Sequence, residues 1–290
     1  MTFLEAVLLG VVQGLFMFLP VSSTAHLVIT QHLLIQGGSG LPLPESPEMI
    51  LFDLVVHVGT LVSIVVVFHK SLRVFLARIW SEALAIASNG GEATKGSLFL
   101  KLAIMGMLTV FVTGVLGLTF KALFEQVFAT PAILAVTLTI TGILLWLTDR
   151  LPARRIGLRG IGPRIAVTVG IAQALSLMPG LSRSGMTICF SLFSGLKRRW
   201  AAEYSFLVAF PTILAATLVQ SLEVFTGLGL GGVSVLAMVT GFVVAAAVGV
   251  VALKLVLILL YRAQLKIFSF YLWGLAAFVA FGFLDHIYGV

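Results

Sequence analysis

The sequence has few charged residues, one cysteine and fewer acidic than basic side chains. Only 10% of its 290 residues are charged, 60% are hydrophobic, and the mean hydropathy is +1.15. A soluble domain carries roughly a quarter charged residues, so this scarcity excludes a soluble protein and indicates an integral membrane protein. A single cysteine, Cys189, excludes an intrachain disulfide and is expected to be a small buried hydrophobe.

The N-terminus and the net charge exclude two further classes. The stretch MTFLEAVLLGVVQGLFMFLP is as apolar as a signal peptide, but it lacks a basic leading region and carries Glu5, so we expect it in the mature fold. The 18 basic and 11 acidic residues give a net charge of +7. In a membrane protein such an excess reports topology, and no nucleic-acid partner is expected.

Long apolar runs fill most of the chain. A spanning helix needs about 20 mostly apolar residues, and six segments qualify: 49–68, 98–118, 130–148, 202–221, 233–259 and 267–287. Two more apolar regions, 3–30 and 164–196, are interrupted by LPVSSTAH (19–26, the first turn) and MPGLSRSG (178–185, the second turn). Their arms are too short to span, so we expect two re-entrant helical hairpins surrounded by protein or a watered cavity. The predicted fold is an all-α polytopic membrane protein with one domain over 1–290.

The basic residues are consistent with this topology. With six spans and two hairpins, all of the 18 basic residues except Lys121, Arg183 and Lys254 fall on one side, which should be cytoplasmic. The opposite loop, 31–48, has two glutamates and no basic residue. We therefore expect the first hairpin to enter from outside and the second from the cytoplasm, with both termini and the 31–48 loop outside.

The two interrupted regions resemble each other. GVVQGLFMFLPVSSTAH (10–26) aligns with GIAQALSLMPGLSRSG (170–185), which pairs Gly10 with Gly170 and Gln13 with Gln173. Because the hairpins enter from opposite faces, we expect an inverted-topology repeat, about 1–120 and about 160–290. In such folds interrupted helices meet near the midplane and form the binding site.

The second turn has the composition of an oxyanion site. An arginine at mid-membrane costs roughly 2.5–3.5 kcal/mol on insertion scales and usually faces a partner or a watered cavity. Arginine binds phosphate through a planar fork, and a helix N-terminus presents free N–H groups. We predict that Arg183 binds a phosphate; the alternative is a structural arginine paired with an acid or a carbonyl. The predicted cradle comprises Gly180, Ser182, Ser184, Gly185 and Thr187.

The first turn adds hydroxyls and a histidine. A serine three residues from a histidine can act as nucleophile with its base, and here these are Ser23 and His26. The alternative for the histidine is a polar core group. Ser22 and Thr24 flank the serine, and Gln13 is expected to hydrogen-bond within the site.

Two acidic side chains are candidates for supporting the predicted phosphate site. Asp53 shares a helix face with His57, four residues on, and could orient the imidazole or pair with Arg183. Glu203 lies near the start of its span, where an acid also favours the helix dipole.

These motifs resemble those of the undecaprenyl-diphosphate phosphatase family of the bacitracin-resistance type, and the similarity covers essentially the whole chain. That family carries a Glu/Gln-x-x-x-Glu motif running into LPVSST-x-H, and a second motif, PG-x-SRSG-x-T; here they read QGLFMFLPVSSTAH and PGLSRSGMT. The resemblance implies a hydrolase of the bacterial plasma membrane that converts undecaprenyl diphosphate to the monophosphate carrier of cell-wall synthesis. It implies that Arg183 binds phosphate, that Ser23 is nucleophile or ligand, and that His26 assists proton transfer.

One position departs from the family pattern. Met17 stands where the family has a glutamate that aids catalysis or holds a divalent cation. Methionine cannot ligate Mg²⁺ or Ca²⁺, which prefer oxygen, so the metal requirement is open. The alternative to the phosphatase is a polyprenyl-phosphate carrier, or a relative that binds the lipid phosphate without cleaving it. Membrane lipids are further expected partners, and a homodimer is compatible with the sequence.

Overall fold

The computed structural model describes residues 1–44, 46–89, 97–120, 131–227 and 234–281. Within these ranges the chain is helical, as predicted, and its only β-bridge joins Ile156 to Leu196. The α-helices are α1 (Phe3–Phe16), α2 (Ser23–Gln36), α3 (Pro47–Asn89), α4 (Leu98–Thr119), α6 (Pro131–Asp149), α7 (Pro163–Leu175), α8 (Arg183–Phe193), α9 (Arg198–Gly227), α10 (Val235–Tyr261) and α11 (Lys266–Ala280).

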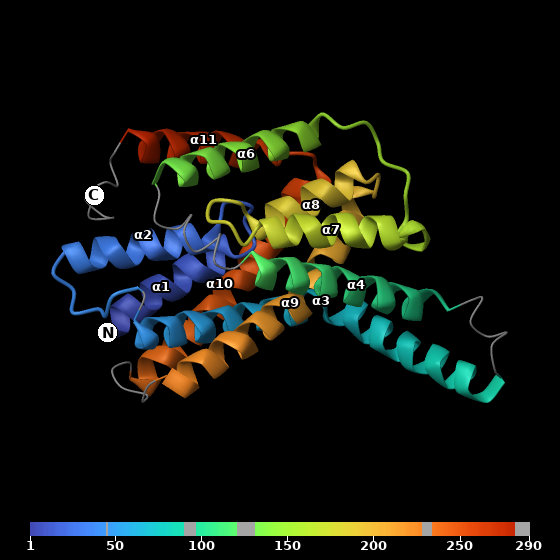
Figure 1. Ribbon diagram of the computed structural model, residues 1–290, viewed down its shortest axis with the longest axis horizontal. Helices are drawn as coiled ribbons and strands as arrows, with labels where there is room; N and C mark the ends of the chain where they lie inside the picture. Colours follow the sequence, from blue (N-terminus) through green and yellow to red (C-terminus); the bar gives the residue numbers. More distant parts are fainter. Residues whose placement is uncertain (45, 90–96, 121–130, 228–233, 282–290) are drawn as a thin grey trace.

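Both predicted hairpins are present, and local sequence explains where their arms begin. Thr2 and Glu5 form a capping box at the start of α1. Pro163 opens α7 at the position where its missing N–H costs nothing. Ser182 caps α8 by accepting from the Gly185 N–H at 3.3 Å. The α1–α2 and α7–α8 hairpins enter the bundle from opposite ends, and their turns meet near its middle (Figure 1).

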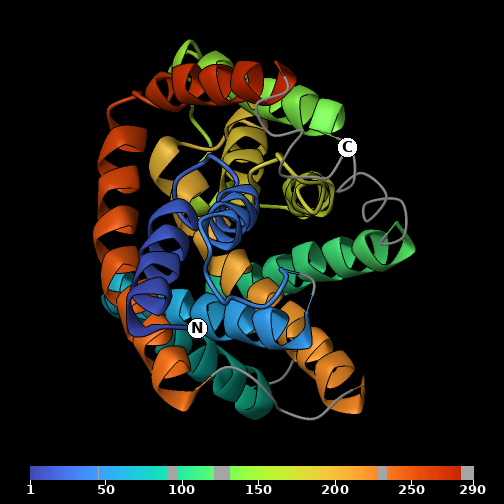
Figure 2. The same cartoon turned by 90° about the vertical axis from the view of Figure 1, so that its left-hand side faces the viewer.

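The longer helices surround the two hairpins. Seen along the long axis, α10, α11 with α6, α4, and α3 with α9 lie around α1, α2, α7 and α8 (Figure 2). The first arm of each hairpin packs mainly on a helix from the other half of the chain: α1 packs on α10, and α7 packs on α4. The interrupted segments are therefore enclosed by protein, which is the condition for irregular backbone at membrane depth.

Four of the described helices are long and apolar enough to cross a membrane: α3, α4, α9 and α10. α6 and the described part of α11 are shorter apolar helices that pack on each other. Residues 282–287 of the last expected span lie outside the described residues, as do Lys95 and Lys121.

The segment after the expected span 49–68 is helical rather than a loop. α3 continues through the basic positions Lys70, Arg73 and Arg78 to Asn89, giving 43 residues. The reason is local, since residues 69–89 are rich in helix formers and contain neither proline nor glycine. The remaining described basic segments, 150–164, 197–199 and 262–266, lie at the same end of the bundle as the end of α3 (Figure 1).

The two halves make equivalent close contacts. A Cβ on Gly10 of α1 would lie 2.9 Å from the Gly241 carbonyl oxygen and 3.1 Å from Val244 of α10. A Cβ on Gly170 of α7 would lie 2.9 Å from the Thr109 carbonyl oxygen and 2.8 Å from Val112 of α4. Each of the two aligned glycines thus contacts a backbone carbonyl and, three residues further along the same helix, a valine side chain. This is the packing expected of an inverted repeat.

Candidate active site

The two turns touch directly. The Ser184 hydroxyl donates to the Leu19 carbonyl at 3.4 Å, joining the start of α8 to the first turn. Beside it, a Cβ on Gly185 would lie 3.3 Å from Cβ of Pro20, which is tighter than most real Cβ contacts, so glycine favours this close approach. Residues distant in sequence are therefore brought into one cluster, as the repeat predicted.

The sulfur of Met17 lies at the centre of that cluster. It is 3.5 Å from Nε2 of Gln13, 3.8 Å from Oγ of Ser23 and 3.7 Å from Nη2 of Arg183. Met17 follows α1 directly and is 6% exposed. A thioether is a weak acceptor, so three polar groups converge on an atom that satisfies none of them strongly.

Arg183 has no carboxylate partner among the described residues. Its guanidinium is buried, its Nη2 faces the Met17 sulfur, and its Nη1 has no hydrogen-bond partner. The alternative prediction, an ion pair of Arg183 with Asp53 or Glu203, is not found among the described residues. A buried charged donor is costly to leave unsatisfied, so Nη1 of Arg183 has the capacity to bind an anion. It is set in the first turn of α8, where free backbone N–H groups add to the same field.

The serines and the threonine of the second turn organise the helix start. Ser182 and Ser184 hydroxyls lie 3.3 Å apart, and Thr187 bonds back to the Arg183 carbonyl at 2.9 Å. Thr187 also exchanges a short hydrogen bond with Ser205 of α9. These contacts hold Arg183 in place from two helices.

Two threonines of α6, which the sequence motifs did not single out, fix the backbone of the second turn. Thr137 donates to the Pro179 carbonyl at 2.6 Å, and Thr141 donates to the Gly180 carbonyl at 3.1 Å. Gly180 has φ +83°, and a Cβ there would lie 2.1 Å from the Thr137 hydroxyl. Gly180 thus makes the close approach to α6 possible. The sequence signal for these two residues is their spacing: Thr137 and Thr141 are four residues apart in TLTIT, so they share one face of α6.

His26 is held away from Ser23. Its Nδ1 lies 2.8 Å from the Ser22 carbonyl oxygen, and its Nε2 lies 2.6 Å from the hydroxyl of Tyr271 on α11. The ring also stacks on Phe16, with centroids 4.0 Å apart. Because a carbonyl only accepts, we assign the proton to Nδ1, which leaves Nε2 to accept from Tyr271.

The remaining first-turn groups have different surroundings. Ser22 sits in the left-handed region at φ 69° and gives its carbonyl, not its hydroxyl, to His26. Thr24 is exposed. The hydroxyl of Ser23 makes its described contact with the Met17 sulfur, so the expected serine–histidine pair is not hydrogen-bonded here.

The two acids are separated. Asp53 accepts from the Gln31 amide at 3.0 Å, and its own carbonyl, rather than its carboxylate, bonds His57 Nδ1 at 2.7 Å. Glu203 instead pairs with Arg199 at 2.9 Å near the start of α9 and makes no described contact with the turns. Neither acid therefore makes a described contact with Arg183 or with the two turns.

The donor set around Met17 does not suit Mg²⁺ or Ca²⁺. These ions favour carboxylate and carbonyl oxygens, whereas the groups here are an amide, a hydroxyl and a thioether. No group of three or more His, Cys, Asp or Glu side chains gathers within the described ranges. The side-chain oxygen of Gln13 is buried and unpartnered, but one amide oxygen is a poor divalent-cation site.

The fold is that of an all-helical polytopic membrane protein in which the turns of two hairpins meet around Arg183 and Met17. The family described as "Bacitracin resistance protein BacA" matches residues 6–278, and the chain belongs to that family. It is 61% identical over 280 residues to the undecaprenyl-diphosphatase of Halorhodospira halophila, covering 97% of both chains. It is 60% identical to that of Alkalilimnicola ehrlichii, covering 97% of this chain and 96% of the other. It is 34% identical to that of Carboxydothermus hydrogenoformans, covering 93% of each.

Proposed function

We propose that this protein is an undecaprenyl-diphosphate phosphatase, which hydrolyses the lipid diphosphate to undecaprenyl phosphate and inorganic phosphate. The observation that carries the proposal is the buried, unpartnered Nη1 of Arg183 at the start of α8. Nη2 of the same guanidinium and the hydroxyl of Ser23 face one atom, the Met17 sulfur. The activity named for the relatives requires a site of this chemistry. A terminal phosphate placed here would satisfy Arg183 and the free N–H groups of α8 at once.

The proposed nucleophile is water. Its oxygen bonds to the terminal phosphorus, the bond to the bridging oxygen breaks, and undecaprenyl phosphate leaves with that oxygen; the water protons end on inorganic phosphate and solvent. Ser23 has no described base, because both ring nitrogens of His26 are engaged elsewhere. Phosphoryl transfer through a loose transition state depends chiefly on positioning and charge stabilisation, which Arg183 supplies. Ser23 would then donate to a phosphate oxygen.

Metal independence is part of the proposal. With Met17 in place of a glutamate, the donors around the sulfur include no carboxylate. Positive charge must then come from Arg183 and from the α8 N-terminus.

The proposed topology places the basic end of the bundle in the cytoplasm and both termini with the 31–48 loop outside. The lipid would enter from the outer leaflet with its chain between helices. The repeat boundaries near 120 and 160, the single domain and a homodimer stay predictions.

A second function is favoured by one observation. The neutral sulfur of Met17 lies where a catalytic acid would be needed, so a protein that binds the lipid diphosphate or monophosphate without cleaving it could serve as a carrier. Retention of Ser23 in contact with the same sulfur favours the phosphatase.

The test is phosphate release from undecaprenyl diphosphate by purified protein, with Mg²⁺, with Ca²⁺ and with EDTA. We expect release in all three conditions and a loss of about 10²–10³-fold in Arg183→Ala. Arg164→Ala, which changes an exposed arginine at the start of α7, is the matched control. Binding of the lipid without release would favour the carrier.

A further inference from the structure

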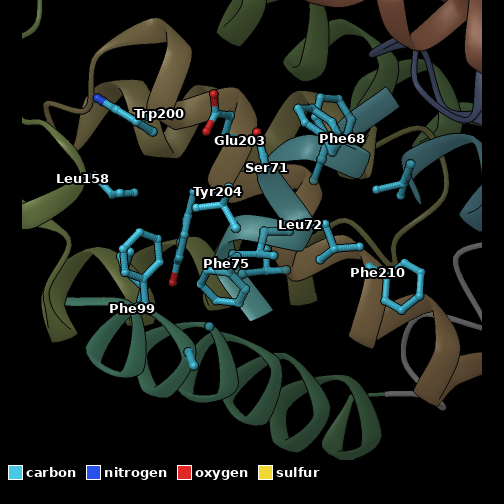
Figure 3. A pocket seen from close by; sticks show the side chains of 18 of the residues that line it. Phe68, Ser71, Leu72, Phe75, Phe99, Leu158, Trp200, Glu203, Tyr204 and Phe210 are labelled. Carbon is cyan, nitrogen blue, oxygen red and sulfur yellow. The ribbon is translucent and has the colours of Figure 1, made fainter. Parts of the chain in front are cut away.

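A groove lies between α3, α4 and α9, apart from the two turns. Its volume is about 540 Å³, within the range of roughly 300–1,000 Å³ typical of small-molecule sites. Aromatic and aliphatic side chains line most of it, among them Phe68, Phe75, Phe99, Tyr204 and Phe210 (Figure 3). This shape and composition suit a hydrocarbon chain.

Charged groups accompany the apolar lining. Lys70 and Arg199 are exposed cations that line the groove, together with Glu203. Arg199 uses Nε to bond Glu203 at 2.9 Å and lies 4.9 Å from the Trp200 ring centroid. Its two terminal nitrogens make no hydrogen bond with any residue in the described ranges, and neither does Lys70. Two cations against one acid leave the groove with a net positive charge, suited to a phosphate group.

The groove is separated from the candidate active site. Phe206 lines it, and the centroid of the same ring lies 5.9 Å from that of Phe68 and 6.0 Å from that of Phe18, which directly precedes the first turn. The Phe206 ring therefore lies between the groove and the start of the first turn. Its lining also includes Leu158 of the basic 150–164 segment, which places it toward the basic end of the bundle.

We propose that this groove is a binding site for an anionic glycerophospholipid, with one acyl chain among the aromatic side chains and the phosphate at Lys70 and Arg199. The basic end is the one that the positive-inside rule assigns to the cytoplasm, and the cytoplasmic leaflet attracts juxtamembrane basic groups through its anionic lipids. Trp200, beside Arg199, is the residue type enriched at this membrane interface. The inference does not depend on hydrolysis by the other site.

The chain offers a matched pair of variants for the apolar part. A Cβ on Gly106, which lines the groove, would meet only Val208 at 3.9 Å, so a leucine side chain can extend into the cavity without displacing backbone. Gly114, two turns further along α4, is exposed and has nothing within 4 Å of a Cβ. Gly106→Leu should block the acyl chain, whereas Gly114→Leu changes the same helix without touching the groove.

The measurement is native mass spectrometry of the detergent-purified protein titrated with phosphatidylglycerol, and with phosphatidylcholine of the same chains. We expect tighter binding of the first phosphatidylglycerol than of phosphatidylcholine. Lys70→Ala and Arg199→Ala should each weaken phosphatidylglycerol binding about five-fold, the value of one basic residue near an anionic surface. Arg73→Ala, on the same helix but outside the groove lining, should not change it.

A structural role for these residues predicts a different pattern. Glu203→Gln removes the acid that competes for Arg199 and should tighten phosphatidylglycerol binding, which destabilisation would not do. Equal affinities for the two phospholipids, or equal effects of Gly106→Leu and Gly114→Leu, would overturn the proposal. So would displacement of bound phosphatidylglycerol by undecaprenyl phosphate at matched concentration, which would assign the groove to the polyprenyl lipid instead.

Discussion

The sulfur of Met17 lies 3.7 Å from Nη2 of Arg183, so the guanidinium at the centre of this site faces a neutral atom. A carboxylate at the same position would form an ion pair with Arg183 and compete with a phosphate for it. Here the competition is absent, and the arginine keeps its charge available for a ligand. Methionine in place of the family's glutamate also removes the carboxylate that could act as a base or bind a metal ion.

Met17→Glu should supply the two properties that the thioether lacks, which are proton acceptance and cation binding. Its oxygen would lie beside Arg183, Gln13 and Ser23, where it could accept a proton from water or ligate a cation. We expect turnover to rise by about 10²-fold, the lower end of the contribution of a positioned general base, and a dependence on Mg²⁺ or Ca²⁺ to appear.

Met17→Gln is the control for that change, since it has the shape of glutamate without its charge. The assay is phosphate release in the presence of divalent cation and of EDTA. Equal rates for the glutamate and glutamine variants would show that charge at this position has no effect on the reaction.

Ser23→Ala distinguishes a phosphate ligand from a nucleophile. If Ser23 only donates a hydrogen bond, its loss should reduce kcat/KM by about five- to tenfold, the value of one hydrogen bond. Ser81→Ala, an exposed serine whose hydroxyl bonds within α3, should be silent. A loss of several orders of magnitude in Ser23→Ala, or trapping of a phosphoserine, would mean that the serine itself attacks.

Thr137→Val and Thr141→Val should damage the second turn without touching the substrate. Each removes a hydroxyl that donates to a turn carbonyl, at 2.6 Å to Pro179 and at 3.1 Å to Gly180. The buried carbonyls would be left unsatisfied, so we expect a loss of about 1–3 kcal/mol of stability each and a parallel loss of activity.

The neighbouring Thr139→Val provides the comparison. Its hydroxyl bonds only the Ala135 carbonyl of its own helix, so thermal stability and activity should stay near those of the parent protein. If the three valine variants lose stability equally, the bonds to the turn are not what holds it.

The repeat can be tested through its aligned glycines. Gly10→Ala and Gly170→Ala would each place a Cβ 2.9 Å from a backbone carbonyl of the crossing helix. Overpacking of this kind costs about 1–3 kcal/mol, and we expect similar falls in thermal stability from both. Gly114→Ala, with open space around it, should be neutral. Unequal losses at Gly10 and Gly170 would argue against equivalent packing in the two halves.

The sequence was sufficient to predict what depends on local pattern. Apolar length, the two small-residue turns and the segregation of basic residues predicted the helical bundle, the hairpins and the meeting of Arg183 with the first turn. The extent of α3 differs from the prediction because lysine and arginine are good helix formers as well as loop residues, so their presence after residue 68 does not end the helix.

The side-chain contacts that the turns make with the surrounding helices could not be predicted from the sequence. Tyr271 reaches His26 across 245 residues, and Thr137 reaches Pro179 across 42. Neither leaves a local pattern. Glu203 was considered for the site because it lies early in its span, but α9 begins at Arg198, and Arg199 is then one helical turn away and captures the carboxylate.

The bond from Ser184 to Leu19 joins groups 165 residues apart, and this spacing has a consequence for biosynthesis. At ribosomal rates of roughly 5–20 residues per second, the second turn follows the first into the membrane on the order of ten seconds later or more. Throughout that interval the first hairpin holds Gln13 and Ser23 without the helix that completes their surroundings. The complete surroundings of these polar groups therefore form only after the second hairpin has been synthesised.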